Sequence, residues 1–137
     1  MTTGDREPQA LRPAGWAAPV GYTDGVVASG RMIVLAGQIG WNPATAAFES
    51  DDLIAQVTQA LRNIVTLLAE AGAEPRHIVR LTWFVIDRDE YLTARRAIGT
   101  AYRTIIGANY PPMTLIVVAG LLEPRARVEI EATAVIP

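Results

Sequence analysis

The stretch YPPMTLIVVAGL (residues 110–121), followed by RVEIEATAV (residues 127–135), decides how this chain folds. Both segments have the length and the β-branched content of strands. The second alternates between faces: Val128, Ile130, Ala132 and Ala134 are expected on a core face, and Glu129, Glu131, Thr133 and Val135 on the opposite one. Residues 115–118 are continuously apolar, which predicts a central strand covered on both faces, and the diproline marks where that strand begins. Together the two strands are expected to place two carboxylates beside Met113.

The composition indicates one globular domain and makes metal chemistry improbable. Half of the 137 residues are hydrophobic, 19% are charged and the net charge is −2, which gives no electrostatic case for binding nucleic acid or an anionic membrane. The chain has no cysteine and one histidine, so disulfides, thiol nucleophiles and a protein-only zinc or iron site are not expected. A high apolar fraction at this length hints at a partner subunit.

The N-terminus carries no targeting pattern. The first 13 residues are polar with two prolines and lack the apolar core of a signal peptide, and no apolar run approaches the roughly 20 residues of a membrane span. We therefore expect a cytoplasmic protein, with a flexible arm over residues 1–15 and a single domain over residues 16–137. Trp16 and Tyr22 are interpreted as anchors for the arm or as groups that stack on a ligand.

Spacing along the chain predicts the remaining elements. Residues 26–28 and 32–38 are expected to form a hairpin, with residues 32–36 as a central strand, and 37–43 as a turn or the lip of a pocket. A helix capped by Ser50 or Asp51 follows and ends at Gly72. Its apolar positions have three-and-four spacing: Leu53, Ile54, Val57, Leu61, Ile64, Val65, Leu68 and Ala71.

The second half continues with a strand over residues 78–86 and a helix from about 91 to 106. In the strand, Val79, Leu81, Trp83 and Val85 are expected to share the face opposite Arg80, Thr82, Phe84 and Ile86. The helix is expected to turn Leu92, Ile98, Ala101, Tyr102 and Ile105 inward. The order β-β-α-β-α-β-β predicts an α+β two-layer domain, with two helices on one face of a mixed sheet. The open face, which would carry Glu129 and Glu131, needs a cover, so sheets from several copies are expected to pack together.

Few residues suggest chemistry by themselves. No phosphate loop, nucleophile elbow, metalloprotease helix or dinucleotide fingerprint is present. His77 is interpreted as a surface or junction residue, and Arg95-Arg96 as a solvated helix face or as the source of a guanidinium for an anion. Glu129 and Glu131 are either strand surface and intersubunit ion-pair partners, or, for Glu129, the carboxylate that positions a catalytic water.

The order of several motifs resembles the RidA (YjgF) family. They are Gly21-Tyr22-Thr23-Asp24-Gly25, Leu35-Ala36-Gly37-Gln38-Ile39 with Asn42-Pro43, Gln56 with Leu61-Arg62-Asn63-Ile64, Ala71-Gly72, Pro111 and Val128-Glu129-Ile130-Glu131-Ala132. The resemblance runs from Tyr22 to the C-terminus. It implies a chorismate-mutase-like fold, a homotrimer with three clefts between subunits, and hydrolysis of reactive enamines and imines without metal or cofactor.

The same resemblance implies a cleft and one departure from the family's pattern. The expected cleft residues are Tyr22, Ala36, Gly37, Met113, Thr114, Leu115 and, as the carboxylate that orients water, Glu129. The family's pattern has an arginine at position 113, where it grips a substrate carboxylate, and methionine has no donor.

Three outcomes stay open. Met113, Leu115 and Trp41 would make an apolar cleft for a bulkier or less acidic imine or enamine; Arg96 would replace the missing grip; or the protein is a non-enzymatic trimer that binds a small ligand or a partner protein.

Overall fold

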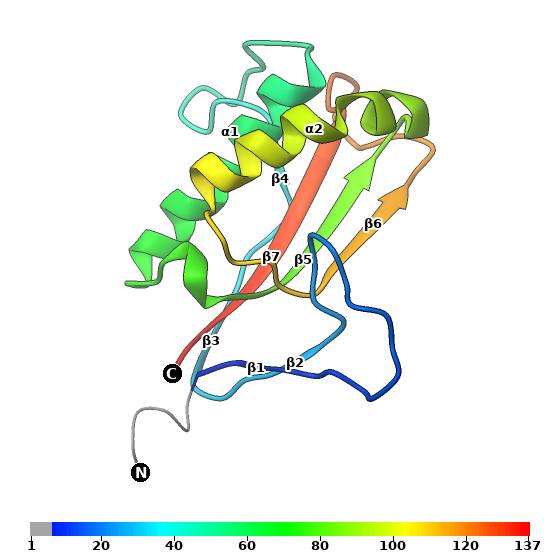
Figure 1. Ribbon diagram of the computed structural model, residues 1–137. Helices are drawn as coiled ribbons and strands as arrows, with labels where there is room; N and C mark the ends of the chain where they lie inside the picture. The colour runs from blue at the N-terminus through cyan, green and yellow to red at the C-terminus, as the bar shows by residue number, and fades with distance from the viewer. Residues whose placement is uncertain (1–6) are drawn as a thin grey trace.

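The computed structural model describes residues 7–137, so residues 1–6 of the predicted arm lie outside the described residues. The elements follow in this order: β1 (Gln9–Ala10), β2 (Val26–Val27), β3 (Arg31–Val34), β4 (Gln38–Ile39), α1 (Leu53–Glu70), the short 3-10 helix η2 (Pro75–His77), β5 (Ile78–Val85), α2 (Arg88–Ile105), β6 (Met113–Val117) and β7 (Val128–Ile136). Figure 1 shows both long helices on the same face of the sheet, which confirms the two-layer α+β prediction.

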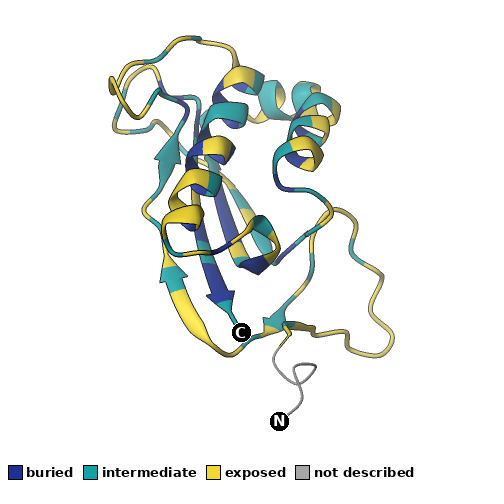
Figure 2. Cartoon of the chain, turned by 90° about the vertical axis from the view of Figure 1, so that its left-hand side faces the viewer, coloured by how far each residue is buried: buried dark blue, intermediate teal, exposed yellow. Residues whose placement is uncertain are grey.

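The sheet has the order β3-β7-β5-β6, and β4 also pairs with β7. β5 and β6 run parallel, while β7 is antiparallel to β3, β4 and β5, so the sheet is mixed as predicted. The core lies between this sheet and the helices, where the dark blue residues of Figure 2 gather. It includes Leu61, Ile64 and Leu68 of α1 and Leu81 and Ile130 of the sheet, all almost fully buried.

The prediction that residues 32–36 and 115–118 form central strands is wrong. β3 and β6 lie at opposite edges of the sheet, and the central strands are β5 and β7. The apolar side chains of Met32 and Val34 are 69% and 70% exposed, and that of Ile116 is 41% exposed. A continuous apolar run is typical of a strand whose two faces are both covered. In a single chain the helices cover only one face of this sheet, and the other face is open.

The predicted hairpin over residues 26–38 is also wrong. β2 pairs with β1, inside the predicted N-terminal arm, and β3 pairs with β7. The connection between β2 and β3 turns at Gly30, whose φ is +139° and whose missing side chain leaves room for the carbonyl of Ile136. In the sequence, a glycine needed for close approach of two backbones cannot be distinguished from a glycine of a hairpin turn.

α1 agrees with its prediction except at its first residue. Its N-cap is Asp52, whose side chain accepts a hydrogen bond of 2.9 Å from the backbone N–H of Ala55, instead of Ser50 or Asp51. The helix turns Leu53, Val57 and Leu61 into the core with the residues named above, and ends before Gly72 at φ +73°.

α2 begins at Arg88, three residues earlier than predicted, because Asp87 caps it by accepting from the N–H of Glu90 at 3.0 Å. Asp89 and Glu90 then lie in the first turn, where the helix dipole favours acids. Ile98 and Tyr102 are buried as predicted, whereas Leu92 is 38% exposed.

β5 contains an irregularity that shifts its alternation. Ile78 pairs with Ala134 and Arg80 with Thr133, so one extra residue lies in β5 between them. Ile78 is consequently buried where Val79 was expected. Beyond the bulge the register is regular, and Thr82 and Phe84 lie opposite Glu131 and Glu129 on the face without helices. This confirms the predicted composition of the open face.

Candidate functional site

Glu129 lies on the open face of β7, beside the backbone of Gly37. β7 pairs there with Ile39 on one side and with Phe84 on the other. A Cβ atom at Gly37 would lie 2.7 Å from Oε1 of Glu129. The carboxylate therefore packs directly over the backbone that joins β3 to β4. The structure thus brings together two of the residues expected in the cleft, Gly37 and Glu129.

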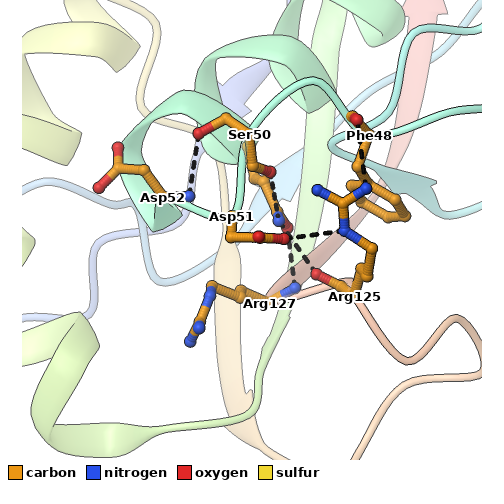
Figure 3. A network of polar contacts seen from close by, with 7 residues as sticks. Phe48, Ser50, Asp51, Asp52, Arg125 and Arg127 are labelled. Carbon is orange, nitrogen blue, oxygen red and sulfur yellow. Dashed lines mark hydrogen bonds and ion pairs between the residues drawn. The ribbon is translucent and has the colours of Figure 1, made fainter.

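Gln56 of α1 fixes the segment that leads into β7. Its side chain is 1% exposed; Nε2 donates to the carbonyls of Ser50 and Arg125 at 3.0 Å each, and Oε1 accepts from the N–H of Arg127 at 2.8 Å. Figure 3 shows this network, in which the guanidinium of Arg125 also reaches Asp51 at 2.9 Å. These contacts fix Arg127, which immediately precedes β7 and lies two residues before Glu129.

Asn63 and Gly40 fix the loop on the other side of Glu129. Nδ2 of Asn63 donates to the carbonyls of Trp41 and Ile39 at 3.2 and 3.4 Å. Gly40 packs against the backbone of Gln56 so closely that a Cβ has no room. The loop then returns with Trp41 tilted against Phe48 at 6.0 Å between ring centroids. α1 thereby holds both segments that flank the carboxylate.

Met113 lines a cavity of about 440 Å³ on the other face of the sheet, between α2 and the strands β5 and β6. Its lining residues are Val20, Gly21, Leu81, Trp83, Tyr91, Arg95, Ile98, Gly99, Tyr102, Arg103, Tyr110, Pro111 and Met113. Thr23 ties the N-terminal loop to the rim, because its hydroxyl donates to the carbonyl of Tyr110 at 2.6 Å. Tyr102 and Tyr110 stack at 5.5 Å.

Met113 and Glu129 do not meet within one chain, so the expectation of two carboxylates beside Met113 is wrong for a single copy. Met113 pairs with Leu81, which faces the helices, whereas Glu129 pairs with Phe84 on the open face. β5 also separates β6 from β7. Opposed residues share a face, so Leu115 follows Met113 to the helix side and Thr114 points with Thr82 to the open side.

The other expected cleft residues lie apart from Met113. Trp41 is in the β4–α1 loop and does not line the cavity. Tyr22 is 43% exposed and follows Gly21 at the rim. Arg96 is exposed on α2, and its neighbour Arg95 lines the cavity in its place. Sequence spacing explains this, because Arg95 lies on the same helical stripe as the buried Ile98 and Tyr102.

Burial controls the ionisation of the cavity tyrosines. It raises the pKa of Tyr91 above its usual value, while the positive charge of Arg95 works against that rise. Burial also raises the pKa of Tyr102, and the neighbouring Tyr110 adds to the effect. The side chains of Tyr91 and Tyr102 are therefore neutral hydroxyl groups at physiological pH. In the same cavity, Nε1 of Trp83 is buried without an acceptor among residues 7–137.

His77 has a structural role. It is buried, and its Nδ1 accepts a hydrogen bond of 2.8 Å from the backbone N–H of Glu74 at the start of η2. It lies at the predicted junction but not on the surface.

Residues 7–137 contain no cluster of three or more histidine, cysteine or acidic side chains placed to hold a metal ion. Within the same residues no helix combines the length and apolarity needed to cross a membrane.

Several cavity residues were not predicted as site residues, among them Tyr91, Gly99, Arg103 and Tyr110. The first three recur with Arg95, Ile98 and Tyr102 at intervals of three and four along α2. That spacing identifies a stripe facing the sheet, but it does not distinguish a filled core from a cavity.

The family model described as Endoribonuclease L-PSP matches residues 13–136. The chain belongs to the RidA (YjgF) family. The Myxococcus xanthus protein DfrA is 32% identical over 131 residues, which cover 96% of this chain and 91% of that protein. The 2-iminobutanoate/2-iminopropanoate deaminase of Salmonella typhimurium is 35% identical over 106 residues, covering 77% of this chain and 80% of the enzyme.

Solved structures of this family share the fold. YyfB of Yersinia pestis, a Rid-family protein of unknown function, has a TM-score of 0.82 to this RidA-family chain at 31% identity, and the match covers 95% of this chain and 99% of YyfB. The chorismate-mutase-like prediction is thereby confirmed, with two helices on a mixed sheet.

Proposed function

We propose that this RidA-family protein hydrolyses a reactive imine or enamine in a cleft made by two copies of the chain. The observation that carries the proposal is the position of Glu129 over Gly37, on the face of the sheet opposite Met113. A cleft that uses both residues requires Glu129 from one copy and Met113 from another. Relatives at 35% and 36% identity are named 2-iminobutanoate/2-iminopropanoate deaminases, which supports the reaction class.

The reaction needs one carboxylate and one water. Glu129 accepts a proton from the water as its oxygen forms a bond to the imine carbon, and the C=N electron pair moves to nitrogen, which takes up that proton. In the resulting carbinolamine, Glu129 takes the hydroxyl proton and passes it to nitrogen; the C=O bond forms as the C–N bond breaks, and the products are a carbonyl compound and ammonia. The absence of a side chain at Gly37 leaves room for the carboxylate of Glu129, which occupies that space.

The composition of the open face of the sheet supports assembly of several copies through that face. Met32, Val34 and Ile116 expose apolar side chains there, while the hydroxyl of Thr82 is buried without a partner among residues 7–137. Packing open faces together would bury the apolar groups. We propose the homotrimer that the family resemblance implies.

Met113 directs the choice of substrate. A thioether offers no hydrogen bond to a carboxylate, and leaving an anion unpaired in a cleft costs about 1–3 kcal/mol or more. The thioether of Met113 favours apolar and aromatic groups instead. We propose a bulkier or less acidic substrate than small 2-imino acids.

Ammonia release from freshly generated imines tests the proposal. An amino-acid oxidase supplies imines derived from alanine, leucine and phenylalanine, and semicarbazide traps what is not hydrolysed. The wild type should accelerate ammonia release, with bulky substrates preferred, and Glu129→Gln should lower that rate about 100-fold or more. A wild type without activity, together with a Met113→Arg variant that hydrolyses small imines, would contradict deamination by the wild type. It would also show that the scaffold can still support the reaction.

A non-enzymatic ligand-binding or partner-binding trimer is the second candidate. Within the described part of the chain, residues 7–137, no carboxylate and no histidine line the cavity at Met113, which favours binding without chemistry. In that case Glu129→Gln would weaken assembly and change no turnover. RNA cleavage, which the family description names, finds less support, because the single histidine is committed to the backbone of Glu74 and the net charge is −2.

A further inference from the structure

We propose that Arg95 and Arg103 bind the carboxylate of an aromatic 2-oxo or 2-imino acid whose ring occupies the cavity at Met113. The inference rests on the proposed function for the reaction that the ligand undergoes, because it names the substrate class of the same cleft. Binding itself requires only the cavity of α2, β5 and β6.

The charges that line the cavity have one sign. Among residues 7–137, Arg95 and Arg103 are the two charged side chains that line it, and no acidic residue does. Among residues 7–137, the ion pairs of α2 involve Arg88 and Glu90 at its N-terminal end, and none involves either cavity arginine. Two guanidinium groups beside one apolar cavity favour an anionic ligand, and the planar fork of arginine matches a carboxylate.

Gly99 separates the two arginines and creates the space between them. It lies four residues after Arg95 and four before Arg103, so the three stack along one stripe of α2. A Cβ at Gly99 would lie 3.4 Å from Nη1 of Arg103, so that guanidinium folds back over the glycine toward Arg95. Glycine in a helix interior costs about 0.5–1 kcal/mol relative to alanine. Here it lines the cavity without filling it, one helical turn from each arginine.

In the part of the chain that the structure describes, the guanidinium of Arg103 makes one weak hydrogen bond. Its Nη2 donates to the hydroxyl of Thr100 at 3.4 Å, near the outer limit for a hydrogen bond. The position of Arg95 at the cavity wall agrees with its effect on Tyr91, since its charge opposes the rise in the pKa of that phenol. Both arginines can therefore turn to a carboxylate without breaking an ion pair among residues 7–137.

The rest of the wall fits a flat, apolar group. Trp83, Met113 and the stacked pair Tyr102–Tyr110 supply aromatic and thioether surface, and Trp83 adds a buried Nε1 donor with no acceptor in residues 7–137. Stacked rings and sulfur contacts favour an aromatic ligand over a methyl or ethyl side chain. A volume of about 440 Å³ lies in the usual range for small-molecule sites.

Calorimetric titration with three probes tests the inference on the full chain in its native assembly. Phenylpyruvate has both the ring and the carboxylate, phenylacetone lacks the carboxylate, and pyruvate lacks the ring. The wild type should bind phenylpyruvate at least about tenfold more tightly than either other probe. Arg95→Gln and Arg103→Gln should each weaken phenylpyruvate about tenfold and leave phenylacetone unchanged.

Two further variants separate the possible results. Arg62→Gln removes the same charge from an exposed position on α1 and should leave phenylpyruvate binding unchanged. Glu129→Gln should retain binding. Equal affinity for phenylpyruvate in the wild type and in an Arg95→Gln/Arg103→Gln double variant with an unchanged circular dichroism spectrum would overturn the inference, as would loss of binding only in Arg96→Gln.

The binding and turnover results can fail independently. Arginine-dependent phenylpyruvate binding without ammonia release from any imine would refute the proposed function and leave this inference standing. Ammonia release from small imines without phenylpyruvate binding would refute the inference alone.

Discussion

The carboxylate of Glu129 occupies the space that a side chain at Gly37 would need. A Cβ there would lie 2.7 Å from Oε1 and 2.9 Å from both Cδ and Cγ of Glu129. Real Cβ contacts are not that short, so either the carboxylate or the backbone would have to move. Glycine at position 37 therefore fixes where Glu129 points.

Gly37→Ala should disable the site without unfolding the protein. Gly37 does not have a left-handed φ, so alanine is compatible with its backbone, and the methyl group pushes the flexible end of Glu129 aside. Because a misplaced general base loses most of its effect, we expect ammonia release to fall about 10-fold to 100-fold. The melting temperature should change little.

Gly120→Ala is the matched control, since a Cβ at Gly120 meets nothing within 4 Å and its φ is not left-handed either. Its turnover should equal that of the wild type. Full activity in Gly37→Ala would mean that the contact between Glu129 and Gly37 has no part in the reaction.

Gln56→Met should lower the free energy of unfolding, although methionine and glutamine have similar side-chain volumes. The change leaves the carbonyls of Ser50 and Arg125 and the N–H of Arg127 without their partner. Each buried group left unsatisfied costs about 1–3 kcal/mol, so we expect the free energy of unfolding in urea to fall by roughly 2–4 kcal/mol. Gln9→Met, at an exposed position, should change it by less than about 0.5 kcal/mol. Equal stability of the two variants would show that water replaces Gln56.

The sequence predicted the helices and the faces of the long strands because local rules decide them. The three-and-four spacing of α1 and the alternation of β7 agree with the buried residues, except that Val135, expected on the open face, is buried. Glu129 was identified correctly as a residue of the open face for the same reason. Its proximity to Gly37 was expected from the family resemblance alone, since β4 pairs with β7 across about ninety residues of chain and no local pattern reports that pairing.

Pairing partners and edges needed the structure. β3 and β6 carry the apolar pattern of central strands because their outer faces need a cover that one chain does not supply. The choice between Arg95 and Arg96 depended on a helix that begins three residues earlier than predicted and on its rotation toward the sheet. The stripe that Arg95 shares with Ile98 and Tyr102 is a local feature, whereas the cavity beside it is not.

Alkaline pH should destabilise the protein through its buried tyrosines. Burial raises the pKa of Tyr102 and Tyr91 in the folded state, so above about pH 10 the unfolded chain has lost protons that the folded chain keeps. The unfolding free energy should be level below that pH and fall as pH rises above it. Tyr102→Phe should make the decline shallower in urea titrations at pH 9 to about 11.

The same variant removes the hydrogen bond that Tyr102 donates to the carbonyl of Asn109 at 2.6 Å. We therefore expect a loss of about 1 kcal/mol at pH 7 as well. An alkaline decline with the slope of the wild type would show that other groups cause it.

Val34→Glu should prevent assembly and, with it, turnover. Val34 is 70% exposed at the edge strand β3 and lines a small hollow of the open face together with Glu131. A second carboxylate there would have to be buried beside a like charge, which is unfavourable by several kcal/mol. We expect sedimentation velocity at micromolar concentration to show a monomer in place of a trimer.

Leu122→Glu adds the same charge to a 97% exposed residue between β6 and β7 and should leave the trimer intact. Because Met113 and Glu129 lie on opposite faces of one sheet, a monomer offers only half of the proposed cleft, so ammonia release should disappear with the trimer. A Val34→Glu monomer that retains full activity would place the whole reaction within one chain. A wild type that sediments as a monomer would refute the assembly itself.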